Sequence, residues 1–164
     1  VADRVKVLGP WMVIPLDSCK PGAPGGYLKP SELDELEEIL HKAPGYFVLI
    51  ALHHPPIATQ SAWLDTMQIS NSSDFQQRIE KYPNVRAVVF GHIHQEWISY
   101  WNDTILMGTP STGFQFAPKS DAFKIDPIPP GYRRISLKSD GKVTTSVHRL
   151  RALPEGFDPE AKGY

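Results

Sequence analysis

The hydrophobic positions along the first half of the chain predict strands that alternate with helices. A continuous apolar run at 46–52 has the pattern of a strand that is buried on both faces, and residues 85–90 predict a second buried strand. A shorter apolar run at 11–16 predicts one more strand. A capping-box sequence at Ser31 precedes apolar residues at helical spacing, and Ser72 begins a second polar cap. We therefore expect helices that end before Pro44 and at Lys81.

The second half of the chain predicts antiparallel hairpins. Residues 96–101 and 104–107 flank the turn at 102–103, and residues 132–138 and 142–149 flank the turn at 139–141. The second turn ends in Asp140-Gly141, a strong local signal for a hairpin. The whole order predicts an α/β chain with a mixed sheet and an antiparallel end. We expect one domain over 1–150 and a polar tail over 151–164.

The composition is that of an ordinary globular domain. Hydrophobic residues make up 41% and charged residues 21% of the 164 residues, which suits a single domain with a core. The net charge of −1 argues against a nucleic-acid-binding domain, which usually carries a basic patch. No apolar run approaches about 18 residues, so no membrane span is expected. The single cysteine, Cys19, excludes an intrachain disulfide and fits a cytoplasmic location.

Histidines stand directly after both of the strands that are predicted to be buried. His53 and His54 follow the first strand, and His92 and His94 follow the second after Gly91. A helix between the two strands predicts a right-handed parallel crossover, which places both strand ends at the same edge of the sheet. That edge is where open α/β sheets bind ligands. The four histidines are therefore expected to converge there.

Because neutral imidazole is a common nitrogen ligand of divalent metals, one interpretation of this convergence is a metal site. In extended chain His92 and His94 would lie about 6–7 Å apart, a separation that can serve two ions. Neighbouring residues of a strand point to opposite sides, so only His53 of the first pair is expected to face the metals. The alternative is that each pair is a hydrogen-bonded loop feature. The remaining histidines, His41 and His148, are interpreted as structural.

The sequence around these histidines resembles the calcineurin-like metallophosphoesterases. Two segments carry this resemblance, Leu52-His53-His54-Pro55-Pro56 and Gly91-His92-Ile93-His94-Gln95. The surrounding segments narrow it, because 61–65, 91–96, 109–112, 115–116 and 130–133 are similar to those of the bacterial class III 3′,5′-cyclic-AMP phosphodiesterases. The resemblance runs from about residue 11 to residue 149 of the chain.

The resemblance implies a fold and a role for three histidines. His53 and His92 would bind one metal and His94 the other, with iron, manganese or zinc as the two divalent ions. The family fold is a four-layer α/β/β/α sandwich of two sheets between helices. This chain would supply the C-terminal half of that sandwich, with a mixed sheet and antiparallel hairpins.

The resemblance also implies a reaction, the hydrolysis of 3′,5′-cyclic AMP to 5′-AMP. Asn71 and the segment 109–116, with Thr109 and Gln115, are expected to line the substrate pocket, with ordinary turn and cap roles as the alternative. The family motifs D-x-H, G-D-x-x-D and G-N-H, which carry the bridging aspartate and the catalytic histidine, do not occur in the chain. No catalytic residue is therefore expected here, and we interpret the chain as an inactive or weakly active portion of a longer enzyme.

The absent motifs lead to an expectation about partners. Half of a sandwich would expose apolar surface, so we expect a homo-oligomer or association with the missing N-terminal segment. Two other functions stay open. One is the hydrolysis of another phosphodiester, such as a glycerophosphodiester or a nucleotide-linked lipid. The other is a non-catalytic binding or interaction module with a residual metal site.

Overall fold

A six-stranded mixed sheet forms the centre of the computed structural model, which describes residues 1–162. The strand order is β1-β2-β3-β4-β6-β5. The inner strands β2, β3, β4 and β6 run parallel, while β1 and β5 are antiparallel edge strands. The strands are β1 (Lys6–Leu8), β2 (Trp11–Pro15), β3 (Phe47–Leu52), β4 (Val85–Phe90), β5 (Trp97–Trp101) and β6 (Thr104–Gly108).

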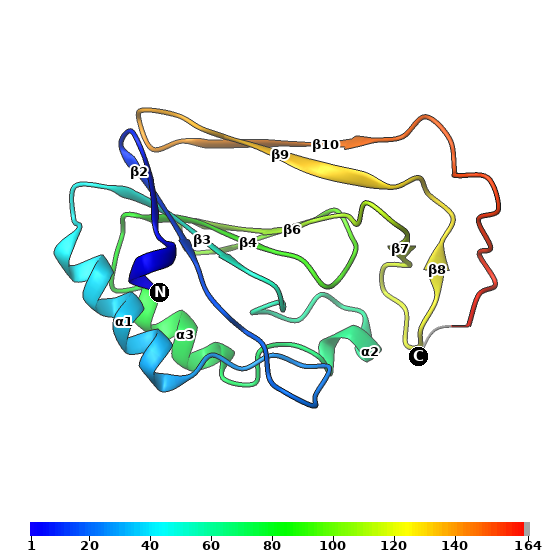
Figure 1. Ribbon diagram of the computed structural model, residues 1–164, viewed down its shortest axis with the longest axis horizontal. Helices are drawn as coiled ribbons and strands as arrows, with labels where there is room; N and C mark the ends of the chain where they lie inside the picture. The colour runs from blue at the N-terminus through cyan, green and yellow to red at the C-terminus, as the bar shows by residue number, and fades with distance from the viewer. Residues whose placement is uncertain (163–164) are drawn as a thin grey trace.

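Different elements cover the two faces of this sheet. Helices α1 (Pro30–Lys42) and α3 (Ser72–Ile79) lie side by side on one face, and the hairpin of β9 (Gly131–Leu137) and β10 (Val143–Arg149) lies over the other (Figure 1). The shorter elements are η1 (Ala2–Arg4), α2 (Ala62–Asp65), β7 (Gln115–Phe116) and β8 (Ile125–Asp126). The resulting order of helices, sheet and ribbon confirms the predicted α/β class with a mixed sheet and antiparallel hairpins.

Alternating side chains of the central strands explain why both faces are covered. On β3, Val48 and Ile50 belong to the core beneath the helices, whereas Leu49 belongs to a second core beneath the hairpin. A strand that is apolar at every position must bury both of its faces, which the continuous run at 46–52 indicated. The Trp11 indole Nε1 also donates to the Lys138 carbonyl at 2.7 Å, which ties the hairpin to the sheet.

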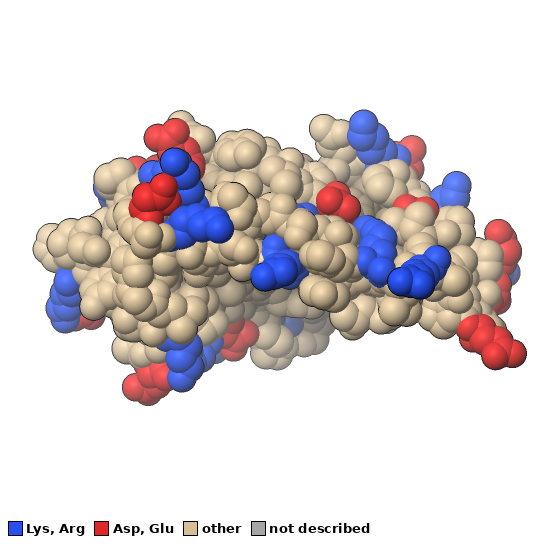
Figure 2. Space-filling view, turned by 90° about the horizontal axis from the view of Figure 1, so that it is seen from above, with Lys and Arg blue, Asp and Glu red and all other residues tan. Residues whose placement is uncertain are grey.

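The outer side of the hairpin layer carries charges of both signs. Lys and Arg side chains lie there in separate groups, with Asp and Glu between them (Figure 2). Among the described residues, no helix has the length and apolar character needed to cross a membrane.

The predicted helices are confirmed, but the capping box at Ser31 is wrong. The N-cap of helix α1 is Lys29, two residues before Ser31, and it makes no side-chain cap bond, while Pro30 lies in the first turn. Proline suits this position because its φ is already helical and it has no N–H to satisfy. The carboxylate that would complete the box, Asp34, instead accepts a hydrogen bond from Arg78 at 2.6 Å. Helix α3 ends at Ile79, two residues before the predicted end.

The first predicted hairpin has a second role that its local sequence does not indicate. Strands β5 and β6 pair as expected, and β6 also pairs in parallel with β4 through Ala87–Ile105 and Val88–Leu106. The second hairpin, β9 with β10, forms with the predicted pairing around Asp140-Gly141. The predicted boundary at residue 150 stays a prediction. Residues 151–162 form no helix or strand, and 163–164 lie outside the described residues.

Candidate metal centre

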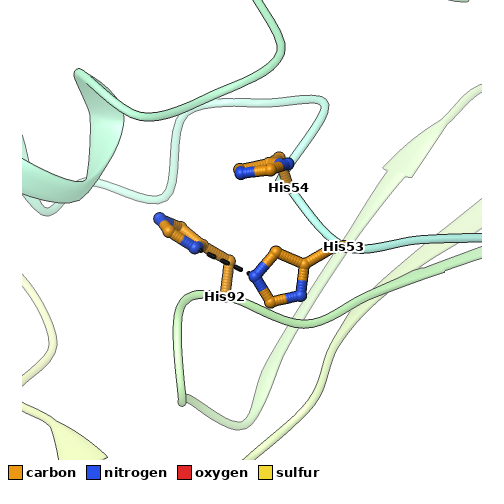
Figure 3. Close-up of side chains that lie close together, drawn as sticks. All are labelled: His53, His54 and His92. Carbon is orange, nitrogen blue, oxygen red and sulfur yellow. Dashed lines mark hydrogen bonds between the residues drawn. The ribbon is translucent and has the colours of Figure 1, made fainter. Parts of the chain in front are cut away.

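Two histidines meet where neighbouring parallel strands end. Strand β3 ends at Leu52 and β4 at Phe90, which are register partners, so the residues that follow share one edge of the sheet. The backbone N–H of Gly91 donates to the His53 carbonyl at 3.1 Å. At this edge His53 Nε2 lies 3.2 Å from His92 Nδ1 (Figure 3). The predicted crossover therefore brings together His53 and His92, which are far apart in sequence.

The segment that carries His92 and His94 is a turn and not extended chain. His92 has φ 62° and His94 has φ 50°, both in the left-handed region, and Ile93 N–H donates to the Gly91 carbonyl at 2.7 Å. The expectation of an extended His92–His94 segment is therefore wrong. Left-handed backbone is uncommon for residues other than glycine, and such residues concentrate at functional sites. Ile93, fully buried between the two histidines, holds the turn in place.

His54 lies beside His53 and His92, contrary to the expectation that it points away. One ring nitrogen from each of the three histidines can be chosen so that all three lie within 4.8 Å of one another. Strand alternation does not apply here because β3 has already ended at Leu52 and the chain bends at His53. The buried Ser18 hydroxyl lies 2.9 Å from His54 Nδ1 and accepts the His54 backbone N–H at 3.2 Å. Ser18 thus holds the ring of His54 within the group.

His94 is positioned by aromatic contacts. Its ring stacks on Phe116 with a centroid distance of 4.5 Å and an interplanar angle of 6°, and it meets the edge of Phe114 at 5.1 Å. Its Nδ1 is buried and has no hydrogen-bond partner among the described residues, and the same holds for Nε2 of His92. Buried polar atoms without partners are rare, and an ion is one explanation for them.

The surroundings keep the clustered imidazoles uncharged near neutral pH. Burial, together with the nearby imidazoles of His54 and His53, lowers the pKa of His92 from 6.5 to about 4. Burial is also the main cause that lowers the pKa of His54 and of His94. Neutral imidazole has a free lone pair, which is the form that binds metals.

The pKa of His92 predicts that the metal-free chain becomes less stable in acid. Since unfolded histidine titrates near 6.5 and folded His92 near 4, the unfolded state binds the extra proton between these values. The contribution of His92 to the free energy of unfolding is therefore fully present above the pKa of the unfolded state. It is lost as the pH drops toward the pKa of the folded state. With allowance for solvent screening, the His92 contribution lost between about pH 7.5 and pH 5 is roughly 1 kcal/mol.

Urea unfolding in the presence of EDTA measures this contribution. His92→Asn is the matched variant because asparagine tolerates left-handed backbone and does not titrate. Its loss of stability between neutral and acid pH should be smaller than that of the unmodified chain. An equal pH dependence in both proteins would show that His92 does not contribute.

The geometry fits a divalent ion between His53 and His92. Two nitrogens at metal distances of about 2.0–2.1 Å in a tetrahedral site lie roughly 3.4 Å apart. The observed separation between His53 Nε2 and His92 Nδ1 is 3.2 Å. Nε2 of His92 and Nδ1 of His94 are buried without partners among the described residues. A second ion would give one of these nitrogens a partner.

The polar groups of Asn71, Thr109 and Gln115 bind backbone. The Asn71 side chain accepts the backbone N–H of Leu28 at 3.1 Å and donates to the Leu28 carbonyl at 2.8 Å. The Thr109 hydroxyl donates to the Phe90 carbonyl at 3.1 Å, and Gln115 accepts from and donates to the backbone of Ser111. In this structure the three residues hold loops together, and their binding of substrate stays a prediction.

An open pocket of about 830 Å³ adjoins the histidines. Its lining combines imidazoles with large apolar side chains: His53, His54, His92, His94, Pro24, Trp63, Leu64, Thr66, Met67, Phe116 and Phe123. Sequence reasoning named the Trp63 and Phe116 segments only through family resemblance, and it missed Met67 and Phe123. Isolated large side chains outside regular helices and strands, such as Met67 and Phe123, carry no periodic signal, so this part of the lining emerges only from the folded structure.

Several named proteins are similar in sequence to most of this chain. The 3′,5′-cyclic adenosine monophosphate phosphodiesterase CpdA of Haemophilus influenzae is 40% identical over 154 residues, which cover 94% of this chain and 56% of the relative. The protein of the same name from Escherichia coli K12 is 39% identical, with 99% and 59% covered. A 3′,5′-cyclic-nucleotide phosphodiesterase of a Nostoc species is 40% identical, with 87% and 53% covered. The chain thus spans a little over half the length of these relatives.

A solved structure supports the fold. GAP50, the anchor in the inner membrane complex of Plasmodium, aligns with a TM-score of 0.52 and 14% identity, covering 89% of this chain and 50% of that one. No family model matches the chain. The identities of about 40% with proteins named as cyclic-nucleotide phosphodiesterases confirm what the histidine segments indicated. Over the segment that it shares with them, this chain is similar to bacterial cyclic-nucleotide phosphodiesterases, and it corresponds to a portion of their length.

Proposed function

We propose that this chain supplies three histidine ligands to a two-metal site in a protein that hydrolyses 3′,5′-cyclic AMP to 5′-AMP. The observation that carries the proposal is the contact of 3.2 Å between His53 Nε2 and His92 Nδ1 at the shared edge of β3 and β4. The relatives that are named as cyclic AMP phosphodiesterases support the choice of substrate.

The three histidines divide between two ions in this proposal. His53 and His92 hold one ion, since their nitrogens already face each other, and His94 offers its unpartnered Nδ1 to the second. The left-handed turn at His92 and His94 and the stacking of His94 on Phe116 orient these ligands. When bound, divalent ions would lower the pKa of a water molecule and offset the charge that develops on the phosphoryl group. Iron, manganese and zinc all accept imidazole ligands.

The imidazoles of His53, His92 and His94 do not complete such a site. Among the described residues, the one compact group of side chains able to hold a metal consists of His53, His54 and His92, with no carboxylate in it. Two divalent ions side by side need negative ligands, so we propose that the bridging carboxylate and the catalytic histidine come from a part of the protein outside these residues. The relatives exceed the matched segment by about two fifths of their length, which gives room for such a part.

The proposal extends to location and association. Cys19 is exposed and unpaired, which suits a reducing compartment, and we propose a cytoplasmic location. Exposed apolar side chains on the two edge strands, Val7 and Leu8 on β1 and Ile98 and Tyr100 on β5, suit association with further chain. Self-association or association with an N-terminal segment stays a prediction.

Substrate competition on the whole protein tests the reaction. The protein is freed of metal, reloaded with manganese, iron or zinc, and offered cyclic AMP together with glycerophosphodiesters and nucleotide-linked lipids. We expect 5′-AMP as the main product, and we expect activity to need the metal. Preference for another phosphodiester would replace the proposed substrate with that class. Failure to retain metal and to cleave any of them would favour a non-catalytic module.

A further inference from the structure

Strand β5 forms an edge of the six-stranded sheet and pairs on one side only, with β6. Proteins that stay monomeric usually protect such an edge with a charge, a proline, a bulge or a very short strand. Residues 97–101 carry no charge and no proline, and their register with β6 is unbroken. The opposite edge, β1, has only three residues and carries Lys6. The edge that lacks protection is therefore β5.

The outer side of β5 presents backbone groups at alternate residues. Because a two-residue turn joins β5 to β6, Trp101 and Thr104 form a hydrogen-bonded pair, and such pairs alternate along an antiparallel ladder. The N–H and C=O groups of Ile98 and Tyr100 therefore point away from β6. No strand among residues 1–162 pairs with this side of β5.

The side chains of Ile98 and Tyr100 add apolar surface to this edge. They stand opposite Met107 and Ile105, which belong to the core beneath the hairpin, so both point to the hairpin side of the sheet. Ile98 is 45% exposed and Tyr100 is 61% exposed. Single exposed apolar residues are ordinary, but these two lie together beside free backbone groups. An added strand would cover both the side chains and the backbone.

The sequence of β5 favours a second copy of the same strand as its partner. Trp97-Ile98-Ser99-Tyr100-Trp101 places large side chains symmetrically on both sides of Ser99. In an antiparallel pair with a two-fold axis at Ser99, Ile98 of each copy stands opposite Tyr100 of the other. These are the two residues whose backbone groups point outward, so the ladder and the side chains agree on one register. Pairs of an aromatic and a β-branched residue across strands are favourable.

We propose that two copies of this chain associate through antiparallel pairing of their β5 strands, with a two-fold axis at Ser99, so that two six-stranded sheets become one. The flanking charges permit this register. Glu96 of each copy stands opposite the neutral Asn102 of the other, and no like charges oppose each other within 95–103. The inference goes beyond the proposed function and is independent of it, since the interface uses neither metal nor substrate.

Sedimentation velocity at several concentrations, in EDTA, measures the association. We expect a discrete dimer that dissociates on dilution, both for this chain and for the longer protein. Ile98→Lys places an ammonium group among apolar side chains of the interface, so it should weaken dimerisation at least about tenfold. Val7→Lys makes a similar change on the exposed edge strand β1 and is the matched control, which should leave the dimer intact.

A cysteine substitution tests the register. In the proposed pairing, residue 99 of both copies forms a non-hydrogen-bonded pair with Cα atoms about 4.5 Å apart, a separation that a disulfide spans. In a Cys19→Ser background, which removes the exposed native thiol, Ser99→Cys should form a covalent dimer with oxidised glutathione. Thr144→Cys, on the exposed face of the hairpin, is the control and should not.

Three results would overturn the interface: a monomer at every concentration, a dimer that the folded Ile98→Lys variant leaves intact, or a dimer that is lost in the longer protein. The last would show that further chain covers β5. Equal cross-linking of Ser99→Cys and Thr144→Cys would reject the pairing at Ser99. Thermal melts show whether each variant is folded, and the cross-link keeps the test decisive even if Ile98→Lys does not fold.

Discussion

Replacing His92 with asparagine is expected to abolish metal binding by this chain and hydrolysis by the whole protein. His92 contributes Nδ1 opposite His53 and has a second, unpartnered nitrogen at Nε2, so its loss removes the centre of the histidine group. Loss of residues that merely orient a metal ligand costs about 10–100-fold in metal affinity, so loss of the ligand itself should cost at least about a hundredfold.

Asparagine separates ligand chemistry from backbone strain. His92 has φ 62°, a conformation that asparagine adopts more readily than most residues, so the turn after β4 should persist. Calorimetric titration with manganese or zinc measures the affinity, and His148→Asn provides the same chemical change on the exposed side of the hairpin. Unchanged metal affinity in a folded His92→Asn chain would remove His92 from the site.

The second large effect concerns the chain by itself. The 164-residue chain, loaded with metal, is expected to release no more 5′-AMP from cyclic AMP than free metal ions do. Its histidine group offers neutral imidazoles and no carboxylate, so two divalent ions cannot be neutralised and each lacks ligands. Without a bridging ligand, the ions are not held at the separation of roughly 3.5–4 Å that in-line attack needs.

Chromatographic detection of 5′-AMP over long incubations measures this activity. The chain with His92→Asn, purified in the same way, is the blank for contaminating host enzymes. Turnover by the unmodified chain at an ordinary enzymatic rate, absent from the blank, would show that these residues form a complete site.

Local sequence was sufficient for most of the elements. The continuous apolar run at 46–52 and the predicted strand at 85–90 correspond to β3 and β4, and the turn at Asp140-Gly141 joins β9 and β10. These signals are local, because burial of both faces of a strand and the chemistry of a tight turn depend on a few adjacent residues. The predicted capping box at Ser31 failed because the Asp34 carboxylate accepts a hydrogen bond from the distant Arg78 and does not cap the helix.

The sequence by itself determined the chemistry at the sheet edge: histidines after two buried strands, separated by a helix, must meet when those strands pair in parallel. The meeting of His53 and His92 follows from that order. The tertiary structure decided the rest. It placed His54 beside them, since strand alternation ends with β3 and Ser18 turns the ring. It also brought Trp63 and Phe123 to His94 through Phe116, because contacts between segments that are far apart in sequence depend on the whole fold and not on any local period.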